Sequence, residues 1–334
     1  MSEETRPIPE LGEFILSQKR FIPEAIRNEI IPVFTAFKLA AKVITLELSH
    51  SNTWDMTSDF HQEPVVSVAT QKLHEAFKNR CVVAGFATSE DDEFVQVDAA
   101  LDKNLVAVVH PLDNFKGDGV EADTHTNVSA GTTLALYQRV SPVGGPVTAE
   151  DFLQKGDQMV AAAYVVYGSS TILVMTLGKQ AGVHGFTLDG GLGVFYLSHR
   201  DIRIPPTTSA APFSVDLGKR RHFSKELLAF VDDCQAKGRG LRYIGSVVAD
   251  VHRNLLKGGL FLYPPTFTEK RPSVYLVFQC IPLAFLIENA GGEASTGDSR
   301  ILGLEPENLD SRCSFFAGSS DLVGGVKAAV MQKA

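Results

Sequence analysis

RYIGSVVADVHR, residues 242–253, is the stretch of sequence that decides the fold. Its apolar residues recur at spacings of three and four, which predicts a helix over residues 245–256. The run GGLFLYP, residues 258–264, follows closely, and VYLVF, residues 274–278, predicts a buried strand. Residues 282–290 predict a further helix, which a Gly-Gly pair ends. Helices that alternate with buried strands indicate a layered α/β or α+β fold.

The chain before residue 203 shows the same alternation. It predicts helices over residues 11–20, 24–49 and 65–77, and strands over residues 81–87, 105–109, 132–137, 183–187 and 194–197. Pro32 predicts a kink or a new helix start. Residues 160–177 carry no charge, but the Gly-Ser-Ser at their centre favours two strands joined by a turn over a membrane span. Residues 203–212 hold three prolines, which predicts a boundary between N-terminal and C-terminal α/β domains of residues 1–202 and 203–334.

Charge and composition narrow the classes of function. The 334-residue chain has 39 Asp and Glu against 31 Lys and Arg, a net charge of -8. This balance argues against nucleic acid and membrane surfaces as partners, since both select basic patches. The four cysteines are far apart and the polar start of the chain lacks a secretory signal, so we expect reduced thiols in a cytoplasmic protein. The surplus of carboxylates fits either a solvated surface or a metal site.

Several long segments carry a resemblance to a known family. They are residues 167–171 (YGSST), 183–189 (VHGFTLD), 242–253, 258–264, 282–292 (PLAFLIENAGG) and 318–323 (GSSDLV). Together they make the chain resemble the fructose-1,6-bisphosphatases over nearly its whole length. The resemblance implies an α-β-α-β-α sandwich of two subdomains, and a homo-oligomer that is a tetramer or a dimer.

Members of that family hold two or three Mg²⁺ ions with clustered carboxylates, and the ions activate water for phosphate ester hydrolysis. The resemblance places the family's Asp-Pro-Leu-Asp-Gly-Ser-Ser motif on HPLDNFK, residues 110–116, where His110 replaces the first Asp and Asp113 is kept. Gln279 replaces a Glu ligand, and an Asp that supports water activation aligns near Val66. The relic positions of a metal site are Glu90, Asp91 and Asp113. Because Mg²⁺ requires charged oxygen ligands, we expect no Mg²⁺ at the family's full occupancy, and no other cofactor.

The substrate positions are also altered. Arg242, Tyr243 and Tyr263 match phosphate or sugar contacts of the family, but Asp216 replaces an Asn and would repel a phosphate dianion. Phe115 adds bulk where the ligand should approach closely. We therefore expect a pocket for a non-phosphorylated small molecule. The candidate substrate-binding residues are Arg242, Tyr243, Tyr263, Asp216, Gln279 and Phe115.

Metal-independent acid/base or cyclisation-type catalysis is the favoured function, with His110, Asp113 and Lys116 as the candidate catalytic residues. His110 has an unperturbed pKa near neutrality, and it is expected to form an oriented acid–base pair with Asp113. Other interpretations stay open. One is a catalytically silent pseudophosphatase with a regulatory or assembly role, and another is a weak sugar-phosphate phosphatase. A zinc site of His110, Asp113 and Glu90 is a further alternative.

Overall fold

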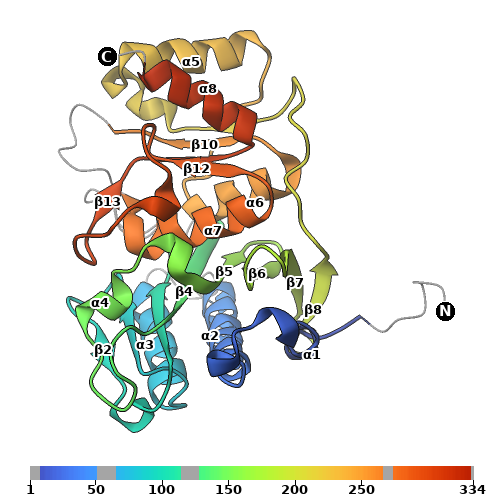
Figure 1. Cartoon of the computed structure of the whole chain (residues 1–334). Coiled ribbons are helices and arrows are strands. Elements are labelled where there is room, and N and C mark those ends of the chain that lie inside the picture. The colour runs from blue at the N-terminus through green and yellow to red at the C-terminus, as the bar shows by residue number, and fades with distance from the viewer. Residues whose placement is uncertain (1–7, 51–64, 114–127, 266–273, 332–334) are drawn as a thin grey trace, which may run out of the picture.

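The computed structural model describes residues 8–50, 65–113, 128–265 and 274–331. Layers of helices and sheets alternate from one end of the molecule to the other (Figure 1). Three hydrophobic clusters fill the spaces between the successive layers. The predicted α-β-α-β-α sandwich is therefore confirmed.

The first sheet contains eight strands in the order β2-β1-β3-β4-β5-β6-β7-β8. Their bounds are β1 Gly85–Thr88, β2 Val95–Gln96, β3 Leu105–His110, β4 Ala130–Gln138, β5 Met159–Tyr167, β6 Thr171–Thr176, β7 Val183–Asp189 and β8 Val194–His199. β1 and β3 pair in parallel, and the other neighbouring strands of this sheet pair antiparallel. The uncharged stretch 160–177 forms β5 and β6, as predicted. Among the residues described, no helix is long and apolar enough to cross a membrane.

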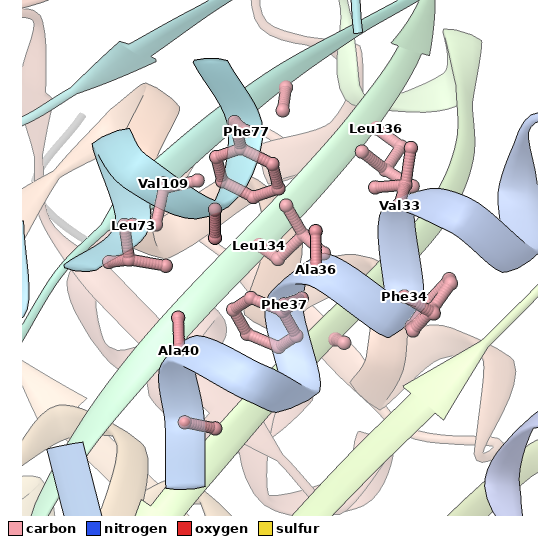
Figure 2. Close-up of a cluster of buried hydrophobic side chains, with 14 of the residues drawn as sticks. Val33, Phe34, Ala36, Phe37, Ala40, Leu73, Phe77, Val109, Leu134 and Leu136 are labelled. Atoms are coloured by element: carbon pink, nitrogen blue, oxygen red, sulfur yellow. The ribbon is translucent and has the colours of Figure 1, made fainter. Parts of the chain in front are cut away.

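Helices α1 (Leu11–Ser17), α2 (Ile30–His50) and α3 (Val65–Lys78) form the first helical layer. Figure 2 shows how side chains of α2 and α3 meet those of β4 in the core between this layer and the sheet. The labelled residues of this core are Val33, Phe34, Ala36, Phe37, Ala40, Leu73, Phe77, Val109, Leu134 and Leu136. Pro32 lies in the first turn of α2, where its missing N–H costs no hydrogen bond, so it accompanies a helix start as predicted. The single helix predicted over 24–49 is wrong in its first turn, because Glu24–Ile26 is a separate 3-10 turn.

The second sheet has the order β12-β14-β10-β9, and β11 pairs with β13 beside it. The bounds are β9 Phe213–Ser214, β10 Leu260–Tyr263, β11 Val274–Tyr275, β12 Glu293–Ser295, β13 Arg312–Cys313 and β14 Phe315–Gly318. The helices of this part are α5 Lys225–Ala236, α6 Val247–Lys257, α7 Ile281–Asn289 and α8 Ser320–Met331, whereas the short α4 (Ala149–Phe152) contacts β3 and β4 of the first sheet. α6 and α7 lie between the two sheets, and α5 and α8 cover the outer face of the second sheet (Figure 1). The core around α6 and α7 contains residues from both predicted domains. The division of the chain into two domains at residue 203 stays a prediction.

A glycine sets how closely α6 approaches the first sheet. A Cβ atom on Gly131 of β4 would lie only 2.2 Å from the Cβ atom of Val248. No side chain fits in that space, so only glycine lets the start of α6 lie against β4. This contact brings the beginning of α6 beside the ends of β3 and β4, where the candidate site lies.

Two predicted strands differ from the structure. Only Val274–Tyr275 of the predicted strand 274–278 is extended, and Leu276–Cys280 is a turn of π-helix that leads into α7. The side chain of Gln279 accepts a hydrogen bond from the backbone N–H of Tyr275 and so favours the helical turn. The strand predicted from residue 81 begins at Gly85, because Cys81 has a φ of 51°, which lies in the left-handed region.

Candidate functional site

The site begins where the parallel strands β1 and β3 end side by side. Ser89 follows β1 and its N–H donates to the carbonyl of Val109 over 3.2 Å. His110 is the last residue of β3, and its side chain is buried. The His110 Nδ1 atom lies 2.5 Å from the hydroxyl oxygen of Ser89. Burial, reinforced by the positive charge of Arg312, lowers the pKa of His110 to about 3, so the imidazole is neutral at physiological pH.

An aromatic and cationic wall faces His110 from the C-terminal half. The ring centroid of Tyr275 lies 5.9 Å from that of His110. The guanidinium carbon of Arg312 stands 3.6 Å from the Tyr275 centroid, since β11 and β13 pair these two residues directly. The Gln279 Oε1 atom accepts a hydrogen bond from the backbone N–H of Tyr275 over 3.1 Å, so this oxygen is already engaged by the protein backbone.

Asp113 joins the end of β3 to the start of α6. Its Oδ1 atom accepts from the N–H of Gly131 at 2.6 Å, and its Oδ2 atom accepts from the N–H of Val248 at 2.8 Å. The hydroxyl of Ser246, the N-cap of α6, contacts both oxygens at 2.9 and 2.8 Å. Burial raises the pKa of Asp113 to about 7, although these hydrogen bonds oppose the shift. Asp113 therefore holds the two parts of the fold together.

The relic carboxylates after β1 do not converge on a shared ion position. Asp91 Oδ2 accepts from Thr88 at 2.6 Å and lies 2.7 Å from His74 Nε2. Burial raises the pKa of Asp91, but the hydrogen bonds with His74 and Thr88 outweigh it and hold the pKa below its ordinary value. Within the described parts of the chain, no three His, Cys, Asp or Glu side chains are placed to hold a metal ion, and the zinc group of His110, Asp113 and Glu90 is not formed.

Three of the predicted substrate residues, Asp216, Tyr243 and Tyr263, lie near one another. Burial raises the pKa of the Tyr243 hydroxyl, and the nearby side chains of Tyr263 and Asp216 raise it further. The Nζ atom of Lys219 lies 5.9 Å from the ring centroid of Tyr263. Asp216 caps the turn that follows it, accepting from the Gly218 N–H at 2.8 Å. Two tyrosines, a carboxylate and an ammonium group thus lie close together.

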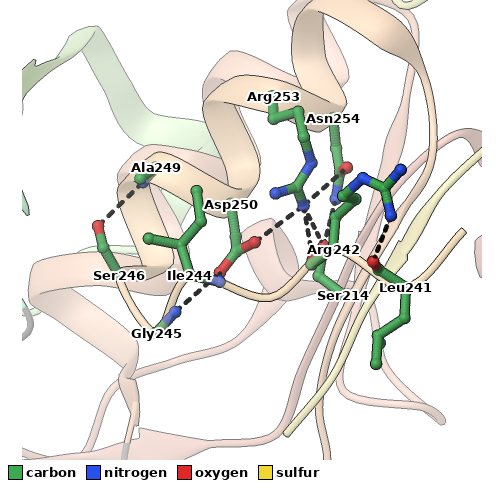
Figure 3. Close-up of polar contacts among 10 residues, drawn as sticks. All are labelled: Ser214, Leu241, Arg242, Ile244, Gly245, Ser246, Ala249, Asp250, Arg253 and Asn254. Atoms are coloured by element: carbon green, nitrogen blue, oxygen red, sulfur yellow. Dashed lines mark hydrogen bonds and ion pairs between the residues drawn. The ribbon is translucent and has the colours of Figure 1, made fainter. Parts of the chain in front are cut away.

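The buried Asp250 and the half-buried Arg253 hold the segment that carries Arg242 and Tyr243 (Figure 3). Asp250 of α6 accepts from the N–H groups of Ile244 and Gly245 at 2.9 and 3.2 Å and pairs with Arg253 at 2.8 Å. Burial raises the pKa of Asp250, and these contacts oppose that shift. Arg253 also donates to the carbonyl of Arg242 at 2.9 Å. The side chain of Arg242 turns back and donates to the carbonyl of Leu241 at 2.7 Å.

The structure brings some of the predicted residues together and separates others. His110 and Gln279 both lie around Tyr275, and Asp216, Tyr243 and Tyr263 cluster. The expected His110–Asp113 pair is not formed, because His110 contacts Ser89 while Asp113 binds the start of α6. Phe115 and Lys116 lie outside the described residues.

Sequence reasoning did not identify several residues of this site: Ser89, His74, Tyr275, Arg312, Ser246, Asp250 and Arg253. Three of these residues had a usable signal. Ser246 directly precedes the apolar helical pattern, as an N-cap does, and Asp250 and Arg253 have the three-residue spacing of a helical ion pair. The contact of Tyr275 with Arg312 depends on strand pairing between distant segments, for which the sequence held no comparable signal.

Comparisons with known proteins agree with this architecture. Residues 10–200 match the family model described as the N-terminal domain of fructose-1-6-bisphosphatase, and residues 204–331 match the one described as its C-terminal domain. The chain therefore belongs to the fructose-1,6-bisphosphatase family, and the resemblance found in the sequence is confirmed.

Solved structures of fructose-1,6-bisphosphatase from Leishmania major are similar over almost the whole chain. The apo form shares 27% identity, with a TM-score of 0.84 over 97% of this chain and 100% of that chain. The holo form has a TM-score of 0.85 at 27% identity, over 97% of this chain and 99% of that chain. The T-state form has a TM-score of 0.85 at 26% identity with the same coverage, 97% and 99%.

Proposed function

We propose that this chain has lost the Mg²⁺-dependent phosphatase chemistry of its family and that its site binds a non-phosphorylated small molecule. Ser89 and His110 then move a proton on that molecule without a metal. The observation that carries the proposal is the hydrogen bond between Ser89 and the neutral imidazole of His110, at a position where the family supplies a carboxylate ligand. A degenerate metal site and a new use of the pocket are two parts of the same proposal.

The charges around the site support this proposal. Gln279 contributes no charge, and its Oε1 atom accepts from the backbone. Asp91 is engaged by His74 and Thr88, and both oxygens of Asp113 accept from the start of α6. A dication would compete with these hydrogen bonds, and the donors displaced at Asp113 would lose their partner in a buried place.

The proposed chemistry uses the hydroxyl–imidazole pair. When Nε2 of His110 carries the ring proton, Nδ1 accepts the hydrogen bond of the Ser89 hydroxyl. As the Ser89 oxygen takes a proton from the ligand, its own hydrogen passes to Nδ1, which leaves the imidazolium and the conjugate base of the ligand. Asp113 is a positioning residue in this scheme, because its contacts hold the end of β3 against α6. Lys116, also predicted to be catalytic, stays a prediction.

The test compares the chain with a variant in which the family's carboxylates are restored, H110D/Q279E. Calorimetry measures Mg²⁺ binding, and a phosphate assay with fructose 1,6-bisphosphate measures turnover with Mg²⁺ and with a chelator. We expect no Mg²⁺-dependent phosphate release from the unchanged chain, and tighter Mg²⁺ binding by the restored variant. The matched control H222D/Q138E adds the same residue types outside the site and should bind Mg²⁺ as the unchanged chain does.

The other interpretations are outcomes of the same experiments. Chelator-sensitive phosphate release by the unchanged chain would establish a weak sugar-phosphate phosphatase and overturn the proposal. Co-purification with an active bisphosphatase, together with no small-molecule binding, would favour the silent pseudophosphatase. We also propose a cytoplasmic homo-oligomer, a tetramer or a dimer, and light scattering of the purified chain tests its oligomeric state directly.

A further inference from the structure

Two of the four cysteines meet where β13 lies beside the entry to α7. Cys313 ends β13 and pairs with Val274 of β11, whereas Cys280 ends the π-helical turn that follows β11. This turn begins at Leu276, whose carbonyl accepts from the N–H of Ile281, so Cys280 is brought back toward the paired strands. A hydrogen bond links the thiols of Cys280 and Cys313. The fold thus brings together two sulfur atoms from separate segments.

The two thiols differ in their access to solvent. Cys280 is fully buried in the hydrophobic core, whereas Cys313 is only partly buried and packs against the same core. Burial, and then the contact with Cys313, raises the pKa of the Cys280 thiol, so Cys280 holds little thiolate at neutral pH. A reagent in solution therefore meets Cys313 first. Cys280 can react only with a sulfur that is already beside it, where proximity offsets its raised pKa.

We propose that Cys280 and Cys313 are a redox modification site, which a low-molecular-weight disulfide such as oxidised glutathione converts to an intramolecular disulfide. The Cys313 sulfur attacks one sulfur of the reagent, whose S–S bond breaks, and one glutathione leaves with the proton of the Cys313 thiol. The Cys280 sulfur then attacks the Cys313 sulfur of this mixed disulfide, and the second glutathione leaves with the proton of the Cys280 thiol. The chain loses two electrons and two protons, which the reagent gains as it becomes two thiols.

This inference goes beyond the proposed function and does not depend on it. Disulfides that form in a reducing compartment are usually transient and redox-sensing, which is the kind proposed here. Cys313 directly follows Arg312, whose guanidinium stacks on Tyr275. Cys280 directly follows Gln279, which accepts from the N–H of Tyr275. The disulfide would therefore cross-link the two segments that hold Tyr275 at the edge of the site.

The test incubates the folded chain with oxidised glutathione, blocks the remaining thiols with N-ethylmaleimide and identifies unreduced tryptic peptides by mass spectrometry. C280A and C313A are compared with C81A. Cys81 is the matched control, since it is also partly exposed and its thiol donates to the carbonyl of Lys78 at 3.5 Å. We expect the Cys280–Cys313 disulfide in the unchanged chain and in C81A, and its loss when dithiothreitol is added.

The single variants separate the two steps. In C280A, glutathione should accumulate on Cys313 to about tenfold or more above its level in the unchanged chain, because no second thiol resolves the mixed disulfide. In C313A, the buried Cys280 should stay unmodified. Should C280A fold poorly, C313A supplies the comparison, because it removes the partly exposed thiol and leaves the core residue in place.

Circular dichroism shows whether the oxidised chain is still folded. The inference is overturned if no Cys280–Cys313 disulfide forms in the folded chain, or if it forms only as the chain unfolds. Equal amounts of glutathione on Cys313 in the unchanged chain and in C280A would show that Cys280 is not the resolving thiol. Modification of Cys280 in C313A would contradict the order of the two steps and the burial on which it rests.

Discussion

His110 makes the stability of the chain depend on pH in a way that one substitution can isolate. The substitution is His110→Asn, which keeps a hydrogen-bonding atom near the position of Nδ1, where Ser89 lies. The side chain is only 7% exposed in the folded chain. Its pKa there is about 3, against an ordinary value of 6.5. The unfolded chain therefore takes up a proton at a pH where the folded chain does not.

The direction in which stability changes with pH follows from the lowered pKa of His110. Above pH 6.5 both states hold His110 neutral and its contribution to stability is complete, and stability falls as the pH drops from 6.5 toward 3. At pH 4.5 the loss is about 3 kcal/mol, from two pH units at about 1.4 kcal/mol each. The asparagine side chain of the variant does not titrate, so the variant lacks this loss.

Urea unfolding followed by circular dichroism, at pH 7.5 and pH 4.5, measures the effect. The free energy of unfolding of the unchanged chain minus that of H110N should fall by about 3 kcal/mol between the two pH values. Tyr137→Phe, which removes a group that does not titrate in this range, controls for general acid effects. Parallel losses in the unchanged chain and H110N would show that His110 titrates alike in both states, and would refute the argument from burial.

Three other substitutions test the packing around the site by the same unfolding measurement. Gly131→Ala should lower the free energy of unfolding by about 3 kcal/mol or more, because its Cβ would lie 2.2 Å from that of Val248. Adding Val248→Gly should recover part of this loss. An unchanged unfolding midpoint for Gly131→Ala would contradict the close approach. Asp113→Asn should lower the free energy of unfolding by about 1–3 kcal/mol, since an amide leaves one of the N–H groups of Gly131 and Val248 without an acceptor. An unchanged free energy of unfolding would refute the anchoring role of Asp113. Tyr137→Phe should be neutral or stabilise the chain by about 1 kcal/mol, because the buried hydroxyl has no hydrogen-bond partner among the described residues, and a clear loss would reveal one.

Much of the fold was predictable because its segments are locally consistent. The uncharged run 160–177 became β5 and β6, and residues 245–256 and 282–290 became α6 and α7 within one or two residues. The order of the layers came from the family resemblance, since local patterns do not specify which helix packs on which sheet. The strand predicted over 274–278 was wrong in its second part because Gln279 bonds back to Tyr275, a local contact that an apolar pattern does not contain.

The site was less predictable than the fold. His110 was singled out by its residue type and by its position at the end of a strand, but its hydrogen-bond partner is Ser89 rather than Asp113. Asp113 instead meets Ser246, 133 positions along the chain. The pKa of a side chain depends on such distant contacts and on burial, so a motif that names the residues does not give their charges.

Asp113 has a consequence for how related sequences are interpreted. Its contacts with the start of α6 give the fold a reason to keep an aspartate at this position whether or not an ion is ever bound. Loss of the metal would remove one selective pressure on the residue and leave another in place. A relative that keeps this aspartate is therefore not marked as an active phosphatase by it, whereas the residue at position 110, which makes no such contact with α6, is the more informative one to compare.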